Sequence, residues 1–251
     1  MLNIQKHRFV LTKILKDIYA DFDLASILGF KGGTALYFFY GLPRFSVDLD
    51  FNLIDLSRKE FIFGRIKRIL KQHGTVKDDC LKKNTIFLLL SYGEPERNVK
   101  VEISLLQFPN EYEIKQYLGL SLLVMKKEYM FVHKMVALTE RKGIASRDIF
   151  DIWFFLKNGW DLKDEIIELR TGLTVKAYLN KCLGLIESVN PKDILQGLGE
   201  VRDNKLKSWV KRNLIPETIF YLKYYLEQTN KSCRGRRFSR PLRESLKIKS
   251  T

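Results

Sequence analysis

Two aspartates separated by one apolar residue form the segment of this chain best suited to chemistry. Asp48 and Asp50 lie in the sequence VDLDF, residues 47–51, in which apolar residues occupy every second position. This alternation indicates a β-strand with one buried face, so both carboxylates should share the other face, roughly 6–7 Å apart. Carboxylates at that distance repel each other without a cation, and Mg²⁺ prefers oxygen ligands. We therefore expect a divalent cation at Asp48 and Asp50; the alternative is the polar face of an exposed strand.

Two glycines upstream of the aspartates indicate a phosphate-binding turn. Gly32 and Gly33 precede a short apolar segment that begins at Thr34 and is typical of a helix. Glycine lets the backbone approach a ligand closely, and the first turn of a helix presents N–H groups to anions. A Gly-Leu-Pro sequence then ends the helix. Arg44 and Ser46 follow it, just before the aspartates, where they could contact triphosphate oxygens.

Together these residues resemble the nucleotidyltransferase superfamily of the DNA polymerase β type, in which Gly-Gly or Gly-Ser precedes DxD or DxE. The sequences GGTAL, GLPRFS and DLDF, within residues 32–51, are similar to the AbiEii/AbiGii toxin family of bacterial type IV toxin–antitoxin systems. The resemblance implies Mg²⁺ or Mn²⁺ as cofactor, a nucleoside triphosphate (NTP) as substrate and a cognate antitoxin as partner.

The superfamily requires a third carboxylate on a neighbouring strand, and Glu102 is the candidate. The sequence VKVEIS, residues 99–104, alternates apolar and polar residues, which places Glu102 on the polar face of a strand. The resemblance implies that this residue acts as a general base or completes the metal site. The alternative is the exposed polar face of an antiparallel strand.

A second group of charged residues lies within residues 126–156. The pattern of this region predicts two helices joined by a Gly-containing turn, with Ser146 as N-cap of the second helix. Lys134 and Arg141 share a face of the first helix, and Asp148 and Asp151 share a face of the second. The apolar stripe of the first helix comprises Phe131, Met135 and Leu138.

By resemblance to AbiEii-like proteins, Lys134 and Asp148 join the active site, with Arg141, Arg147 and Asp151 nearby. Fixed cations would stabilise the negative charge that develops on the phosphates during nucleotide transfer. We therefore expect Lys134→Ala to slow the reaction with little effect on stability. The alternative is that the cations are solvated and that the aspartates complement the N-terminus of their helix.

The order of elements predicts an α+β protein. Helices and strands alternate up to about residue 106, and helical patterns continue to about residue 229. We expect a polymerase-β-like nucleotidyltransferase domain over residues 1–110, with a mixed sheet and flanking helices. A helical domain over residues 111–230 should complete the active-site cleft. Residues 231–251 contain eight basic residues and one acidic residue, which is typical of a solvated or disordered tail.

The formal net charge of +15 indicates a polyanionic partner. Basic residues near Trp209 could line an RNA-facing surface or form a solvated helix face; they are Lys205, Lys207, Lys211 and Arg212. The sequence has no run of 18 apolar residues and no secretion signal, so we expect a cytoplasmic protein without a membrane partner. We also expect a monomer. Neither disulfides nor zinc are expected, because the cysteines show no paired spacing.

The resemblance implies a toxin that transfers a nucleotide from an NTP to RNA, with the tRNA acceptor end as the expected acceptor, and so blocks translation. Two alternatives remain open. A nucleotidyltransferase that modifies a protein or a small molecule would share the same catalytic residues but would not need a basic acceptor surface. A non-catalytic RNA-binding protein that retains the fold would explain the charge but would not need the paired aspartates.

Overall fold

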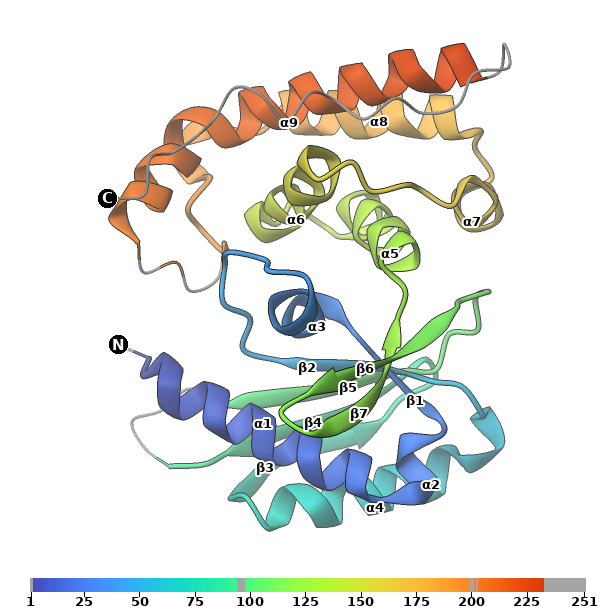
Figure 1. Ribbon diagram of the computed structural model, residues 1–251, viewed down its shortest axis with the longest axis vertical. Coiled ribbons are helices and arrows are strands. Elements are labelled where there is room, and N and C mark those ends of the chain that lie inside the picture. Colours follow the sequence, from blue (N-terminus) through green and yellow to red (C-terminus); the bar gives the residue numbers. More distant parts are fainter. Residues whose placement is uncertain (1, 94–97, 199–200, 202, 233–251) are drawn as a thin grey trace. The chain divides into compact units, whose positions relative to one another are not determined.

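The computed structural model describes residues 2–93, 98–198, 201 and 203–232. Contacts within the chain divide it into two compact units, the first comprising Met1–Met130 with Leu198–Asn204 and the second comprising Phe131–Gly197 with Lys205–Thr251. Of the basic tail, residues 231–251, only the first two residues are described. The rest of the tail, which includes Cys233, lies outside the described residues. Figure 1 shows the elements of both units.

The first unit is built on a seven-stranded mixed sheet with the order β3-β4-β5-β2-β1-β7-β6. Strand β2 runs parallel to β5, and β1 runs parallel to β7, whereas the other neighbouring strands are antiparallel. The strands are β1 (Leu28–Lys31), β2 (Leu49–Leu53), β3 (Thr75–Leu81), β4 (Thr85–Ser91), β5 (Val99–Ser104), β6 (Tyr112–Tyr117) and β7 (Leu120–Met125). The predicted mixed sheet is confirmed.

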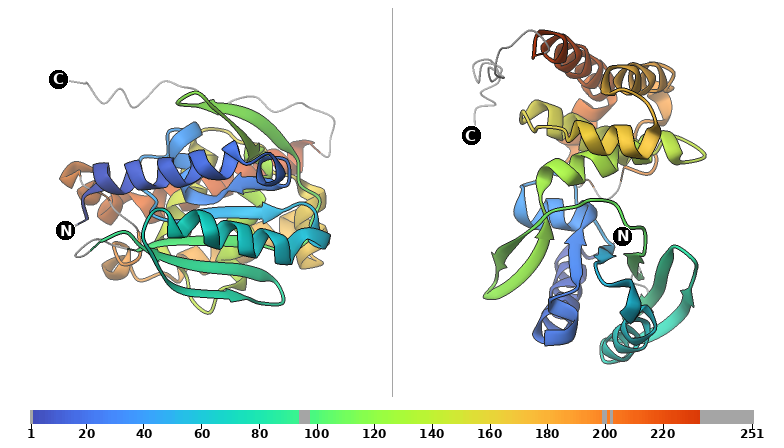
Figure 2. Two further views of the ribbon diagram at one scale, coloured as in Figure 1. Left: turned by 90° about the horizontal axis from the view of Figure 1, so that it is seen from below. Right: turned by 90° about the vertical axis from the view of Figure 1, so that its right-hand side faces the viewer.

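Helices flank this sheet on both faces. The helices of the first unit are α1 (Ile4–Ala20), α2 (Phe22–Ala25), α3 (Gly32–Phe39) and α4 (Lys59–Lys71), with a 3-10 helix η1 (Leu56–Arg58). Helices α1 and α4 pack against each other over one face of the sheet, whereas α3 lies on the opposite face and contacts β1 and β2 (Figures 1 and 2). The buried face of α1 consists of His7, Leu11, Ile14, Leu15 and Ile18, a spacing that follows the helical period.

The hairpin of β6 and β7 was not predicted from the sequence. The predicted boundary of the catalytic domain, after residue 110, lies just before this hairpin. Tyr117 pairs with Leu120, so the loop contains only Leu118 and Gly119. Both loop residues have positive φ, 50° and 80°, as a type I′ turn requires. Asn or Asp usually occupies the first of these positions. Because Leu118 stands there instead, the sequence carries little sign of a hairpin.

The pairing of β2 sets the position of the aspartates. Asp50 lies opposite Lys31 of β1 and opposite Glu102 of β5. Leu49 and Phe51 are fully buried on the other face, where Phe51 packs against the ring of Phe30. Strand β2 begins at Leu49, two residues later than the alternation predicts, so Asp48 directly precedes the strand.

The second unit is helical. Helix α5 (Lys127–Glu140) begins in the first unit and continues into the second. The remaining helices are α6 (Ser146–Lys157), α7 (Asp164–Thr171), α8 (Val175–Glu187) and α9 (Asn204–Ser232), with a 3-10 helix η2 (Pro191–Asp193). Trp153 of α6 packs against Trp209 of α9, with ring centroids 4.4 Å apart, and its indole N–H donates to Glu217 at 2.9 Å.

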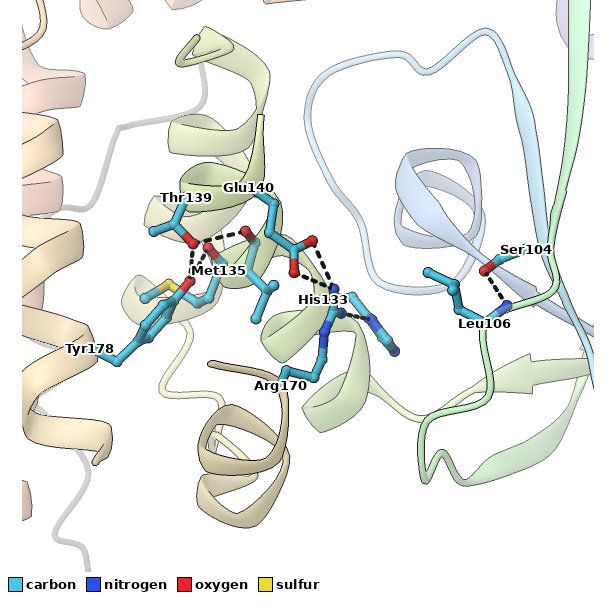
Figure 3. Close-up of polar contacts among 9 residues, drawn as sticks. Ser104, Leu106, His133, Met135, Thr139, Glu140, Arg170 and Tyr178 are labelled. Carbon is cyan, nitrogen blue, oxygen red and sulfur yellow. Dashed lines mark hydrogen bonds and ion pairs between the residues drawn. The ribbon is translucent and has the colours of Figure 1, made fainter. Parts of the chain in front are cut away.

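Polar contacts join α5 to its neighbours α7 and α8 (Figure 3). The Tyr178 hydroxyl donates to the Met135 carbonyl at 2.7 Å. Arg170 donates to His133 Nδ1 at 2.7 Å and pairs with Glu140 at 2.9 Å. His133 therefore contributes to helix packing. The predicted apolar stripe of α5 is buried, with Phe131 and Met135 at 0% exposure and Leu138 at 2%.

No helix in the described part of the chain is long and apolar enough to span a membrane.

Candidate functional site

Asp50 lies in direct contact with the glycine turn. A Cβ atom added to Gly32 would lie 2.3 Å from Asp50 Oδ2, which is too close for any side chain. Gly32 also has a φ of +78°, a conformation that L-residues adopt at a cost. Both the backbone conformation and the space available therefore require glycine, and the turn is built around the Asp50 carboxylate.

The N-terminus of α3 lies next to Arg44 and Ser46, which were predicted to bind phosphate. Lys31, at the N-cap position, makes no side-chain capping hydrogen bond, which is compatible with an anion at this end of the helix. The Thr34 hydroxyl donates a short hydrogen bond to the Asp48 carbonyl. A Cβ on Gly33 would lie 2.7 Å from Ser46 Oγ and 3.2 Å from an Arg44 guanidinium nitrogen.

The structure thus gathers most of the sequence-predicted residues of the first unit around one turn. They are Gly32, Gly33, Thr34, Arg44, Ser46, Asp48 and Asp50. Arg44 is only 3% exposed, so its guanidinium places a fixed positive charge beside the helix N-terminus. A helix N-terminus and an adjacent guanidinium both favour a bound anion.

Lys100 is a charged residue of this site that the sequence reasoning did not select. Its ammonium lies 3.1 Å from Glu102 Oε2 and 3.6 Å from Asp48 Oδ2. Burial opposes the charged form of Lys100, but the carboxylates of Asp48, Asp50 and Glu102 outweigh it, so the pKa of Lys100 is raised. The sequence did carry a signal for Lys100. It lies two residues before Glu102, and residues two apart share a face of a strand.

His7 is a second residue that the sequence did not reveal. Its side chain is fully buried. His7 Nε2 donates to the Val47 carbonyl at 2.9 Å, because a carbonyl can only accept, and Nδ1 forms a hydrogen bond of 2.6 Å with the Tyr92 hydroxyl. His7 thereby anchors the residue that precedes Asp48 to α1.

The donor set fits a divalent cation that is shared with a substrate. Within the described residues, no three His, Cys, Asp or Glu side chains are grouped closely enough to hold a metal ion. Asp48 and Asp50 supply two carboxylates, while Glu102 is paired with Lys100. Mg²⁺ commonly binds one or two carboxylates and completes its shell with water and substrate phosphates. The site therefore fits such a cation better than a closed metal cage.

The charged residues of the second unit form an ion-pair cluster around two buried aspartates. Lys134 Nζ lies 2.8 Å from Asp151 Oδ2 and 3.4 Å from Asp148 Oδ1, and both aspartate side chains are 0% exposed. Arg141 Nη1 lies 3.4 Å from Asp148 Oδ2, without the geometry of a hydrogen bond. Among the described residues no donor satisfies this carboxylate oxygen. A buried acceptor without a donor is uncommon and often marks a functional site.

One expectation for this cluster needs correction. The N-cap of α6 is Ala145, not Ser146, and it makes no side-chain capping bond. Ser146 is the first helical residue and is buried. Arg147 is partly exposed, and no ion pair within the described part of the chain joins it to the cluster, so its role in nucleotide binding stays a prediction. The joining of this cluster with the aspartates of the first unit in one active site stays a prediction.

Comparisons with known proteins support the fold described above. A crystal structure of a proposed nucleotidyltransferase from H. pylori matches with a TM-score of 0.58 and 21% identity, covering 91% of this chain and 96% of that chain. The crystal structure of JHP933 from Helicobacter pylori matches with the same TM-score and identity, covering 93% of this chain and 98% of that chain. These likenesses support the fold. No curated protein sequence gives a significant match.

The family model described as "Nucleotidyl transferase AbiEii toxin, Type IV TA system" matches residues 13–196. This range includes both the glycine turn with its aspartates and the ion-pair cluster of α5 and α6. The chain therefore belongs to the AbiEii family of nucleotidyltransferase toxins.

Proposed function

We propose that this protein is a metal-dependent nucleotidyltransferase that transfers a nucleotide from an NTP to RNA, with the tRNA acceptor end as its acceptor, and so blocks translation. The observation that carries the proposal is the contact between Gly32 and Asp50. A glycine turn at a helix N-terminus, packed on a metal-binding carboxylate, suits a triphosphate and its cation.

The phosphate-binding residues position the NTP. The backbone of Gly32 and Gly33 and the N-terminus of α3 bind phosphate oxygens, and Arg44 neutralises part of their charge. Asp48 and Asp50 hold Mg²⁺ or Mn²⁺, which supplies electrostatic stabilisation of the reacting phosphates. Thr34 and His7 act indirectly, because both hold the backbone next to Asp48 in place.

The transfer step forms one P–O bond and breaks another. A hydroxyl of the RNA attacks the α-phosphorus, and the bond from this phosphorus to the oxygen that bridges to the β-phosphate breaks. Pyrophosphate leaves with the electron pair of that bond. The proton of the attacking hydroxyl passes to a carboxylate, for which we propose Glu102. Lys134 and Arg141 supply positive charge for the developing negative charge, and Asp148 and Asp151 position Lys134.

The charge of the protein supports RNA as the acceptor. The net charge is +15, and Lys205, Lys211 and Arg212 of α9 are exposed. Trp209, in contrast, packs against Trp153, so helix packing accounts for this ring. Membership of a type IV toxin–antitoxin family implies a cognate antitoxin that counters the toxin.

A transfer assay tests the proposal. The full chain is incubated with Mg²⁺ or Mn²⁺, each labelled NTP in turn, and total bacterial RNA together with total protein. We expect label in RNA, and we expect none with tRNA whose 3′ end has been blocked by periodate oxidation. Asp48→Asn and Asp50→Asn should abolish transfer. Asp78→Asn, a matched change of an exposed carboxylate on β3, should leave it intact.

Each contrary result has a distinct meaning. Label that enters protein but never RNA would overturn the RNA acceptor and favour the protein-modifying alternative. Transfer that persists in Asp48→Asn would show that the metal assignment is wrong. If the protein binds RNA but labels neither fraction with any NTP, the non-catalytic alternative is favoured.

A further inference from the structure

Lys100 lies on β5, within 4 Å of the carboxylates of Asp48 and Glu102. On β5, Val99 and Val101 are fully buried, so Lys100 and Glu102 project from the opposite face. Asp50 pairs with Glu102 and Leu49 with Val101. The same parallel register, continued by one residue, places Asp48 beside Lys100. The ammonium therefore lies between the carboxylate of Glu102 on β5 and that of Asp48, which directly precedes β2.

The contacts of Lys100 resemble those of a bridging cation. Its ammonium approaches Glu102 at 3.1 Å and Asp48 at 3.6 Å, so a single positive charge serves two negative side chains. On the other side of β5, strand β4 offers no charge to compete for it, because Leu89 pairs with Lys100 and Phe87 with Glu102. Mutual repulsion of the carboxylates is thus relieved by a residue of the chain itself.

We propose that Lys100 is an internal counter-ion that occupies the carboxylate site in the metal-free protein and that a divalent cation must displace it. This inference rests on the proposed metal site at Asp48 and Asp50. Displacement separates the ammonium from Asp48 and Glu102 and leaves it without a partner when the metal enters alone. When the metal enters with an NTP, the triphosphate supplies a new anionic partner. Lys100 therefore makes tight metal binding conditional on the nucleotide.

The same displacement prepares Glu102 for its proposed task. While Glu102 is paired with Lys100, the ammonium lies 3.1 Å from Oε2 and competes with the attacking hydroxyl for this oxygen. Movement of the ammonium toward the triphosphate removes that constraint. Metal and nucleotide binding are therefore coupled to the release of the proposed base, and by linkage each ligand strengthens the binding of the other.

Direct measurement of Mn²⁺ binding to the full chain tests this inference without an activity assay. The electron paramagnetic resonance signal of free Mn²⁺ gives the dissociation constant, with and without a non-hydrolysable NTP analogue. We expect Lys100→Met to tighten the binding of Mn²⁺ alone by about tenfold, because two partly exposed ion pairs no longer compete. The analogue should then strengthen Mn²⁺ binding less than it does in the wild-type protein.

Three further variants make the result specific. Lys100→Arg keeps the charge and should retain the wild-type affinity. Lys83→Met, at an exposed lysine in the turn between β3 and β4, controls for the change in net charge and should also bind Mn²⁺ as the wild type does. Asp48→Asn should abolish binding.

The outcomes separate this inference from the proposed function. If Lys100→Met binds Mn²⁺ no more tightly than the wild type, while Asp48→Asn abolishes binding, the counter-ion role is overturned and the metal site stands. If Asp48→Asn leaves Mn²⁺ binding unchanged, or if no variant binds Mn²⁺ with or without the analogue, the metal site itself is wrong and both proposals fall.

Discussion

Replacement of Gly32 by alanine tests whether the glycine turn is built around Asp50. A Cβ at this position would lie 2.3 Å from Asp50 Oδ2, whereas ordinary van der Waals contact begins at 3.4 Å, so the carboxylate has to move by about 1 Å. Gly41 offers a matched control. Its φ of +72° is close to the +78° of Gly32, but a Cβ at Gly41 has no neighbour within 4 Å among the described residues.

Both substitutions should lower the stability by a similar amount, but only Gly32→Ala should impair nucleotide transfer and Mn²⁺ binding. Alanine in this left-handed conformation costs about 1–2 kcal/mol, so urea unfolding should show a loss of about that size in both variants. A displacement of about 1 Å at a reacting centre can lower the rate on the order of 100-fold. We therefore expect nucleotide transfer and Mn²⁺ binding to fall sharply in Gly32→Ala, whereas Gly41→Ala should stay within about twofold of the wild type in transfer rate.

Equal transfer rates and equal Mn²⁺ affinities for Gly32→Ala and Gly41→Ala would refute this reasoning, because the contact with Asp50 would then be irrelevant to the site. A much larger loss of stability in Gly32→Ala would show instead that the turn mainly supports the fold. The comparison of unfolding free energy with transfer rate separates these outcomes.

Three other changes test the packing of particular residues. Lys134→Met leaves the fully buried carboxylates of Asp148 and Asp151 without their ammonium partner, so urea unfolding should show a loss of about 3–5 kcal/mol; a loss below about 1 kcal/mol would mean that water reaches the pair. Leu118→Asn places a residue that tolerates positive φ in the β6–β7 turn and should raise the unfolding free energy by about 1 kcal/mol, whereas a decrease would contradict the turn assignment. Burial raises the pKa of the Cys182 thiol to about 12, so at pH 8 iodoacetamide should modify this residue only after unfolding, as mass spectrometry can follow; rapid alkylation of the folded protein would contradict its burial.

Much of the first unit could be predicted from local pattern. Alternation along a strand decides which side chains share a face, so Asp50 and Glu102 were correctly assigned to polar faces before their pairing was known. The glycine turn was also recognisable, since few residues other than glycine tolerate a positive φ and a close neighbour. The β6–β7 hairpin was missed because Leu118 occupies a turn position that usually carries Asn or Asp.

The partners of charged residues were decided by tertiary structure. Helical spacing placed Lys134 and Asp148 on helix faces, but only the packing of α5 against α6 buries both aspartates around the lysine. That burial reverses the expectation that Lys134→Ala would leave stability almost unchanged. Local periodicity determines the direction of a side chain, whereas its neighbours depend on strand register and helix packing between distant segments. Lys100 shows the difference: its face follows from the sequence, but its place beside Asp48 follows from the parallel pairing of β2 with β5.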